Sequence, residues 1–162
     1  MAEWIETYKG AVLVSEYDSA SHMNSQIYVA RFDQATWFLL SSLGITPRSM
    51  KKAGRRVAVV RQSYQYVKEL RGGELVMVRS GFIAVGSKFF RFLHRMLDAE
   101  TGQLIATSDC TAVEASLATG KSVPLPKGMR RLAEARLVTA NVAEQSAPLL
   151  AESRIAERPA KP

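Results

Sequence analysis

Residues 18–37 read DSASHMNSQIYVARFDQATW, and the character of the chain changes within them. The stretch opens as a polar turn that holds Asp18, His22 and Asn24, and it continues as an apolar segment. Asn and Ser side chains cap helix N-termini, so Asn24 or Ser21 can begin a helix here. The start of a helix offers unpaired backbone N–H groups and a partial positive charge. A carboxylate and an imidazole beside it can stabilise an oxyanion and move protons, which makes this turn the candidate for chemistry.

The predicted helix is apolar on more than one side. Its apolar residues recur at steps of three or four, and others widen the face: Tyr28, Phe32, Ala35, Leu39 and Leu43, with Ile27, Ala30 and Phe38 beside them. Such a broad face indicates a helix that other elements wrap rather than one lying on a surface. Gly44 and Pro47 predict where it ends.

Around this helix the sequence has the alternation of strands. A first strand is predicted over residues 10–18, and four more follow the helix, over 56–70, 74–87, 88–97 and 103–116. One strand, one long helix and then an antiparallel run of strands is an α+β order. A short basic amphipathic stretch follows at 127–137. Residues 138–162 are rich in Ala, Glu and Pro, which predicts a domain over 1–137 and a frayed or disordered tail.

Length and composition bound the class of protein. The 162 residues fit one domain, 47% are apolar, and no uncharged apolar run reaches a membrane-spanning length. Glu3 and Glu6 lie in the first segment and no basic region precedes an apolar run, so no signal peptide is expected. Cys110 is the single cysteine, which excludes an intramolecular disulfide and a cysteine zinc site and favours a cytoplasmic setting.

The motif spacing resembles a known family. The pattern Asp18-x3-His22-Met23-Asn24-x3-Tyr28-x3-Phe32-Asp33-x-Ala35-x-Trp37 resembles the signature of the 4-hydroxybenzoyl-CoA thioesterase-like hotdog proteins. Residues 66–75, 86–88 and 98–107 look like that family's later strands and turns, so the resemblance covers most of residues 10–130. Met23 and the run 32–37 look most like the branch that includes betainyl-CoA thioesterases. Many members have glycine before the histidine, where this chain has Ser21.

The resemblance implies a hotdog fold, in which a curved antiparallel sheet wraps a long central helix. It also implies a homodimer or homotetramer with sites between subunits, which hydrolyses an acyl-CoA to the free acid and CoA without a metal or added cofactor. The implied catalytic residues are Asp18, His22 and Asn24, with the backbone N–H groups of Met23 and Asn24 polarising the thioester carbonyl. Tyr28 and Phe32 are the expected acyl-pocket residues.

Several roles stay open on the residues alone. Asp18 also reads as a turn aspartate that accepts backbone N–H bonds, and, if catalytic, it is compatible with general-base or nucleophilic catalysis. His22 is either a proton carrier or a hydrogen-bonding partner that orients the loop. Asp33 is expected to bond backbone or an arginine. The acyl group is not readable from the spacing.

The net charge of +7 is concentrated in residues 48–71, which hold eight basic residues and one acid, Glu69. Such a patch attracts anions. It is read as a solvated loop, as a site for CoA phosphates or as a nucleic-acid surface; the last lacks any accompanying nucleic-acid motif, so no nucleic-acid partner is expected. The predicted CoA contacts are Lys51, Lys52, Arg55, Arg56, Ser87 and Lys88.

Other chemistries fit less well. Residues 115–122, ASLATGKS, resemble a phosphate loop, but Pro124 and Pro126 follow where a helix would have to begin, so a β-turn at Thr119–Gly120 is predicted. His94 is expected to be structural. The competing functions are a non-catalytic acyl-CoA-binding hotdog protein, consistent with Ser21, and a hotdog dehydratase, whose arrangement of Asp and His differs.

Overall fold

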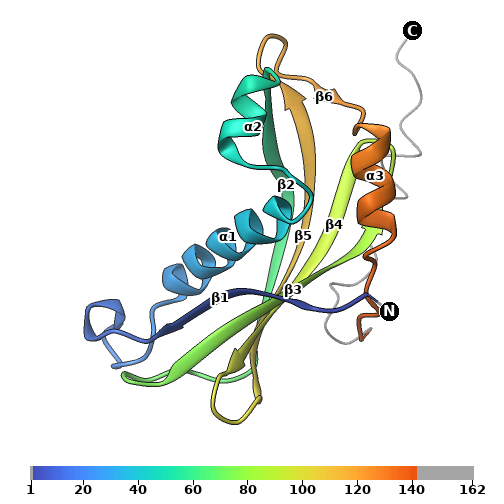
Figure 1. Ribbon diagram of the computed structural model, residues 1–162. Coiled ribbons are helices and arrows are strands. Elements are labelled where there is room, and N and C mark those ends of the chain that lie inside the picture. The colour runs from blue at the N-terminus through green and yellow to red at the C-terminus, as the bar shows by residue number, and fades with distance from the viewer. Residues whose placement is uncertain (1, 142–162) are drawn as a thin grey trace, which may run out of the picture.

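The computed structural model describes residues 2–141 (Figure 1). Its elements run β1 Ile5–Ala11, the 3-10 turn η1 Val14–Glu16, α1 Ser25–Ser41, α2 Pro47–Lys52, β2 Arg55–Tyr66, β3 Leu75–Val85, β4 Phe89–Asp98, β5 Leu104–Ser116, β6 Ser122–Val123 and α3 Lys127–Glu134. The α+β class is confirmed. The tail predicted over 138–162 lies outside the described residues from 142 onward.

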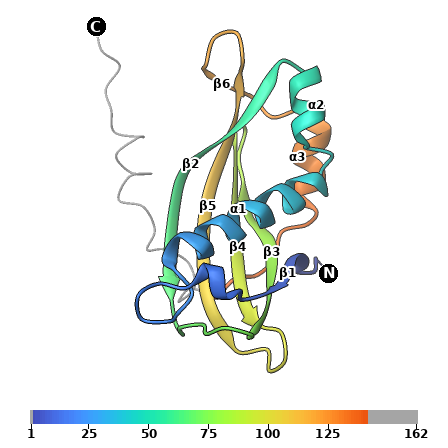
Figure 2. The ribbon, with the colours of Figure 1, turned by 90° about the vertical axis from the view of Figure 1, so that its left-hand side faces the viewer.

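One antiparallel sheet forms the body of the molecule. Its strands lie in the order β1-β3-β4-β5-β2, with β6 paired to β5. Helix α1 lies across one face of this sheet (Figures 1 and 2). Strand β2 pairs only with β5, so it is an edge strand of the described sheet.

The core lies between α1 and the sheet. Phe32, Ala35 and Leu39 of α1 are fully buried, and they pack on side chains of β3, β4 and β5. Burying one such phenylalanine contributes ~1.5–3 kcal/mol. The opposite side of α1 is open, since Val29 is 36% and Phe38 64% exposed. The described residues therefore cover only part of the broad apolar surface of α1 from which a wrapped helix was predicted.

The first strand begins and ends earlier than predicted. Residues 10–18 contain only the last part of β1, and then the turn η1. The apolar alternation is weak in β1 because its buried residue Thr7 is polar and bonds Ser80 Oγ at 2.7 Å. The apolar run at 12–14 was misleading because Leu13 and Val14 are exposed in the turn.

Strand β2 is shorter than predicted, and the segment before it is not all loop. Val67 and Lys68 both donate their N–H groups to the Ile105 carbonyl, so the regular ladder ends there and residues 67–70 leave the sheet. Within the basic segment, Pro47–Lys52 forms α2, capped by Thr46, whose Oγ1 accepts the Ser49 N–H at 3.1 Å. Among the described residues, no helix has the length and apolarity to cross a bilayer.

A buried polar chain joins four elements. His94 of β4 is fully buried; its Nε2 lies 2.9 Å from Thr36 Oγ1 of α1, and its Nδ1 contacts Ser80 Oγ of β3. Ser80 in turn contacts Thr7 of β1. Burial lowers the pKa of His94 to about 3, which makes it a neutral structural residue, as predicted. The turn predicted at Thr119–Gly120 is also confirmed, with Gly120 at φ 69°.

Candidate active site

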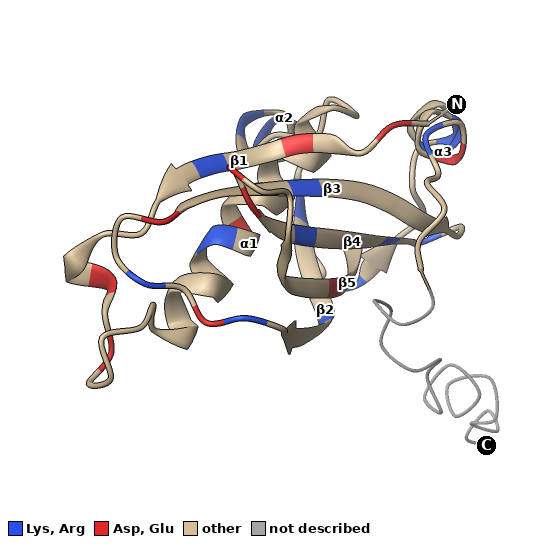
Figure 3. Ribbon diagram, turned by 90° about the horizontal axis from the view of Figure 1, so that it is seen from below, with Lys and Arg blue, Asp and Glu red and all other residues tan. Residues whose placement is uncertain are grey.

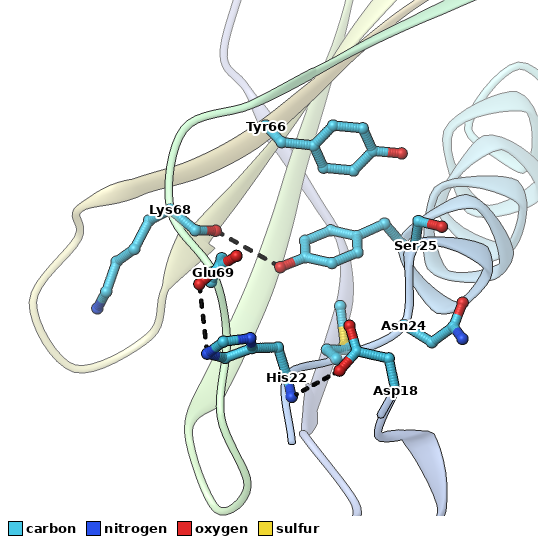
Figure 4. Close-up of a pocket in the computed structure, with 9 residues that line it drawn as sticks. Asp18, His22, Asn24, Ser25, Tyr66, Lys68 and Glu69 are labelled. Carbon is cyan, nitrogen blue, oxygen red and sulfur yellow. Dashed lines mark hydrogen bonds and ion pairs between the residues drawn. The ribbon is translucent and has the colours of Figure 1, made fainter. Parts of the chain in front are cut away.

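A pocket of ≈ 330 Å³ opens at the N-terminus of α1 (Figure 4). One wall is the turn before the helix together with the helix start, and the other is the segment that follows β2. The lining residues are Asp18, His22, Met23, Asn24, Ser25, Tyr28, Tyr66, Lys68 and Glu69.

Asp18 is held by its own turn. Its Oδ1 accepts the N–H groups of Ala20 at 2.8 Å and His22 at 3.1 Å, while its backbone N–H donates to the His22 carbonyl at 2.8 Å. The backbone hydrogen bonds from His22 and then Ala20 lower the pKa of Asp18 below its usual value, because they favour the charged form. Oδ2 has no hydrogen bond within the described residues. Asp18 is therefore a turn aspartate with one oxygen still free.

The two backbone amides that were expected to bind an oxyanion already have hydrogen-bond partners within the protein. Met23 donates its N–H to the Leu70 carbonyl at 2.8 Å, and Asn24 donates its own to the Glu16 carbonyl at 2.8 Å. Neither amide is available to a ligand, so the predicted oxyanion donors are corrected. Asn24 instead caps α1, with its side chain accepting the Gln26 N–H at 3.0 Å.

Ser25 has an amide at the start of α1 that is free within the described residues, and the sequence motif did not single it out. It is the first residue of α1, lines the pocket, and its N–H has no hydrogen-bond partner in residues 2–141. The first amides of a helix have no intrahelical acceptor and carry its positive dipole end. Asn24 as the cap marks Ser25 as the first amide of the helix, but only the fold shows that this amide stays unpaired in the described part of the chain.

His22 and Tyr28 connect the two walls of the pocket. His22 Nε2 lies 3.3 Å from Glu69 Oε2, and the Tyr28 hydroxyl lies 3.5 Å from the Lys68 carbonyl, a long contact. The Tyr28 ring also packs edge-on against Tyr66, with centroids 5.2 Å apart. From the sequence, the segment 66–69 reads as the end of a strand and no site residue is placed there, although Glu69 stands out as the one acid in the basic stretch.

Phe32 does not line this pocket. It is fully buried, lies parallel to His94 with ring centroids 5.8 Å apart, and contacts Tyr64. Its expected role in the acyl pocket is corrected to a role in the core. Asp33 is exposed on α1, and no hydrogen bond to backbone or arginine forms there within the described residues.

The predicted CoA contacts lie elsewhere in the chain. Lys51 and Lys52 end α2 and are exposed, as is Arg56, while Ser87 and Lys88 form the exposed turn between β3 and β4. Arg55 is held internally, 2.6 Å from the fully buried Glu114 carboxylate. None of them lines the Asp18 pocket, and basic residues are spread over several elements (Figure 3). Within residues 2–141, no group of His, Cys, Asp and Glu is arranged to hold a metal.

A family model described as the thioesterase-like superfamily matches residues 12–133. The chain belongs to this family. The match confirms the resemblance that the motif at 18–37 indicated, and the open pocket lies inside the matched range.

Individual proteins similar to this chain are distant in sequence, and solved structures at this distance share its fold. A betainyl-CoA thioesterase from Pseudomonas aeruginosa is 23% identical over 124 residues, which cover 76% of this chain and 78% of that protein. A Staphylococcus aureus protein solved in complex with CoA superposes with a TM-score of 0.75 at 15% identity, covering 98% of this chain and 97% of the other. A putative thioesterase from Pseudomonas putida KT2440 gives 0.74 at 17% identity, covering 91% and 97%.

Proposed function

We propose that this protein is an acyl-CoA thioesterase that uses Asp18. The observation that carries the proposal is the pocket at the start of α1, where an ionised carboxylate and an unpaired helix-terminal amide, that of Ser25, occur together. A carboxylate supplies a base or nucleophile, and the amide supplies a donor for a developing oxyanion. Membership of the thioesterase-like superfamily supports the same reaction.

In the proposed reaction, the thioester carbonyl oxygen accepts the Ser25 N–H. On one route, Asp18 Oδ2 removes a proton from a water molecule while the water oxygen attacks the carbonyl carbon. On the second route, Asp18 Oδ2 attacks that carbon itself. In both routes the carbonyl becomes a tetrahedral oxyanion, stabilised by the amide and the positive end of α1. Its collapse breaks the carbon–sulfur bond and releases CoA thiolate. On the second route, water hydrolyses the resulting anhydride. His22 orients the turn or carries a proton to the leaving thiolate.

A substrate panel tests the activity. Thiol release would be measured with aliphatic, aromatic and betainyl acyl groups, the last because a relative bears that name. Each acyl group would be presented on CoA and on a pantetheine thiol. Turnover supports the proposal, whereas binding without thiol release would make this a non-catalytic acyl-CoA-binding protein. If the KM is lower for the CoA thioester than for the pantetheine thioester, and high salt removes this difference, contacts between the CoA phosphates and basic side chains would be supported. The candidates are Lys51, Lys52, Arg56 and Lys88.

We further propose that the active form is at least a homodimer. The edge strand β2 leaves Val59, Val60 and Tyr66 exposed, and α1 leaves Phe38 exposed. A second copy against this side would cover the open side of α1 and complete the predicted wrapping of a central helix. It would also give the basic residues, remote from Asp18 in their own chain, a route to the partner's pocket.

A further inference from the structure

An ion pair lies behind the catalytic turn, away from the pocket lining. Glu16 of η1 contacts Arg31 of α1 through Oε1 and Nη2, and its side chain is only 9% exposed against 19% for Arg31. The other carboxylate oxygen of Glu16 accepts the Leu13 N–H at 2.9 Å. Arg31 also lies over the Tyr8 ring of β1, with the guanidinium carbon 5.2 Å from the ring centroid. The pair thus ties β1, η1 and α1 together.

The same glutamate holds the base of the catalytic loop. Its backbone carbonyl accepts the Asn24 N–H at 2.8 Å, and the adjacent residue, Tyr17, forms a β-bridge with Met23. Residues 17–23 are therefore a closed loop whose two ends meet at Glu16 and Asn24. Asp18 lies just inside one end of the loop, and Ser25 lies just beyond the other.

Arg31 belongs to α1, the helix whose first amide is that of Ser25. Glu16 belongs to η1, directly before the loop that holds Asp18. We propose that the Glu16–Arg31 pair is a positioning device, which sets the geometry between the Asp18 carboxylate and the Ser25 amide without touching substrate. This inference rests on the proposed function. Reacting groups must be placed closely, since a displacement of about 1 Å can cost about 10²-fold in rate.

The chemistry of a buried pair predicts how variants behave. Removing one partner leaves the other charge buried and uncompensated, whereas removing both avoids that penalty. Arg31→Met should therefore lower kcat about 10- to 100-fold and change the KM for an acyl-CoA less than about threefold, since the pair lies outside the binding pocket. Arg31→Lys should retain more activity than Arg31→Met, and Glu16→Gln with Arg31→Met should recover part of the loss.

The pH profile separates positioning from a general loss of stability. The pKa of Asp18 is lowered by the amides of His22 and Ala20, which need the native loop. In Arg31→Met, the acid limb of the kcat/KM profile should move to higher pH, towards an ordinary carboxyl value. Assays would run well below the melting temperature of each variant. Arg130→Met is the matched control, because it removes an exposed ion pair with Glu134 on α3 and should leave kcat and the profile unchanged.

The outcomes distinguish the two proposals. If the wild type released no thiol, or Asp18→Asn kept full turnover, the proposed function would fail. If Asp18→Asn were inactive while Arg31→Met kept wild-type kcat and pH profile, only the positioning role would fail. Should Arg31→Met not fold, the comparison passes to Arg31→Lys and the double variant: wild-type kcat in both would overturn the inference, and a reduced kcat with an unchanged KM would uphold it.

Discussion

At the scale of single residues, backbone N–H groups donate the hydrogen bonds that hold the turn at 18–24, some to carbonyls and two to the Asp18 carboxylate. The Asp18 carboxylate is held by amides of its own loop, and the Met23 and Asn24 amides are used to fasten that loop to the segment after β2 and to η1. Within residues 2–141, these bonds leave Asp18 Oδ2 and the Ser25 N–H without a hydrogen bond, and both residues line the pocket. Replacing the Asp18 side chain should affect chemistry more than folding.

Asp18→Asn is the direct test. The amide side chain keeps the shape and can still accept N–H bonds, but it is neither a base nor an anionic nucleophile, so we expect kcat to fall about 10²- to 10⁴-fold. Binding of CoA and the melting temperature should be nearly unchanged. Asp33→Asn, an exposed carboxylate of α1 outside the pocket, is the control and should stay near wild type. Equal losses in the two variants would argue against Asp18 as the reacting group.

Ser21 carries the strain of the loop. It has φ 63°, and no other non-glycine residue described has a positive φ. This left-handed conformation costs a residue with a Cβ about 1–2 kcal/mol, whereas glycine adopts it freely. Ser21→Gly should therefore raise the free energy of unfolding by ~0.5–1 kcal/mol after the extra chain entropy of glycine is deducted. Urea unfolding measures it, and Ser19→Gly in the same loop should show no gain.

At the scale of elements, the sheet and α1 are joined by a polar chain as well as by apolar packing. Thr7, Ser80, His94 and Thr36 link β1, β3, β4 and α1. His94 must stay neutral to remain there, because its pKa falls to about 3 from 6.5 on burial. At a pH between these two pKa values, His94 therefore binds a proton in the unfolded chain but not in the folded protein.

This difference in proton binding predicts that the free energy of unfolding decreases as the pH falls. The His94 contribution is fully present above pH 6.5 and is lost as pH falls towards 3. Between pH 6.5 and 5 the loss should approach ~2 kcal/mol, at about 1.4 kcal/mol per pH unit. Urea unfolding at several pH values measures it, and His94→Gln should flatten the dependence in this range. A wild-type stability that does not change from pH 7 to 5 would contradict the assignment.

At the scale of the whole molecule, residues 2–141 enclose α1 only in part and leave one edge of β2 without a strand partner. Val60 in that edge is 61% exposed. If a second copy covers this side, Val60→Lys should place a charge in the interface, shift the protein from dimer to monomer and lower turnover with it. Light scattering with the thiol assay checks both. Leu132→Lys on α3, at 39% exposure, is the control. A monomeric wild type with full activity would contradict a shared site.

Much of the fold was readable from local pattern. The helix α1 from its Asn24 cap, the antiparallel run from β2 to β5, the turn at 119–120 and the structural role of His94 all follow from periodicity, capping and turn residues, because each depends on near neighbours in sequence. The motif from Asp18 to Trp37 identified the family correctly. The bounds of β1 and the end of β2 did not follow, since they depend on which distant strand supplies the pairing groups.

What the sequence determined by itself is the chemistry available at the helix start: the carboxylate, the imidazole, the cap and the amides behind them. Tertiary structure alone decided which of these groups stay free. The Leu70 carbonyl takes the Met23 amide, the Glu16 carbonyl takes that of Asn24, and Ser25 remains. A backbone amide looks the same in every residue of the sequence, and its role depends on whether folding brings an acceptor within about 3 Å of it.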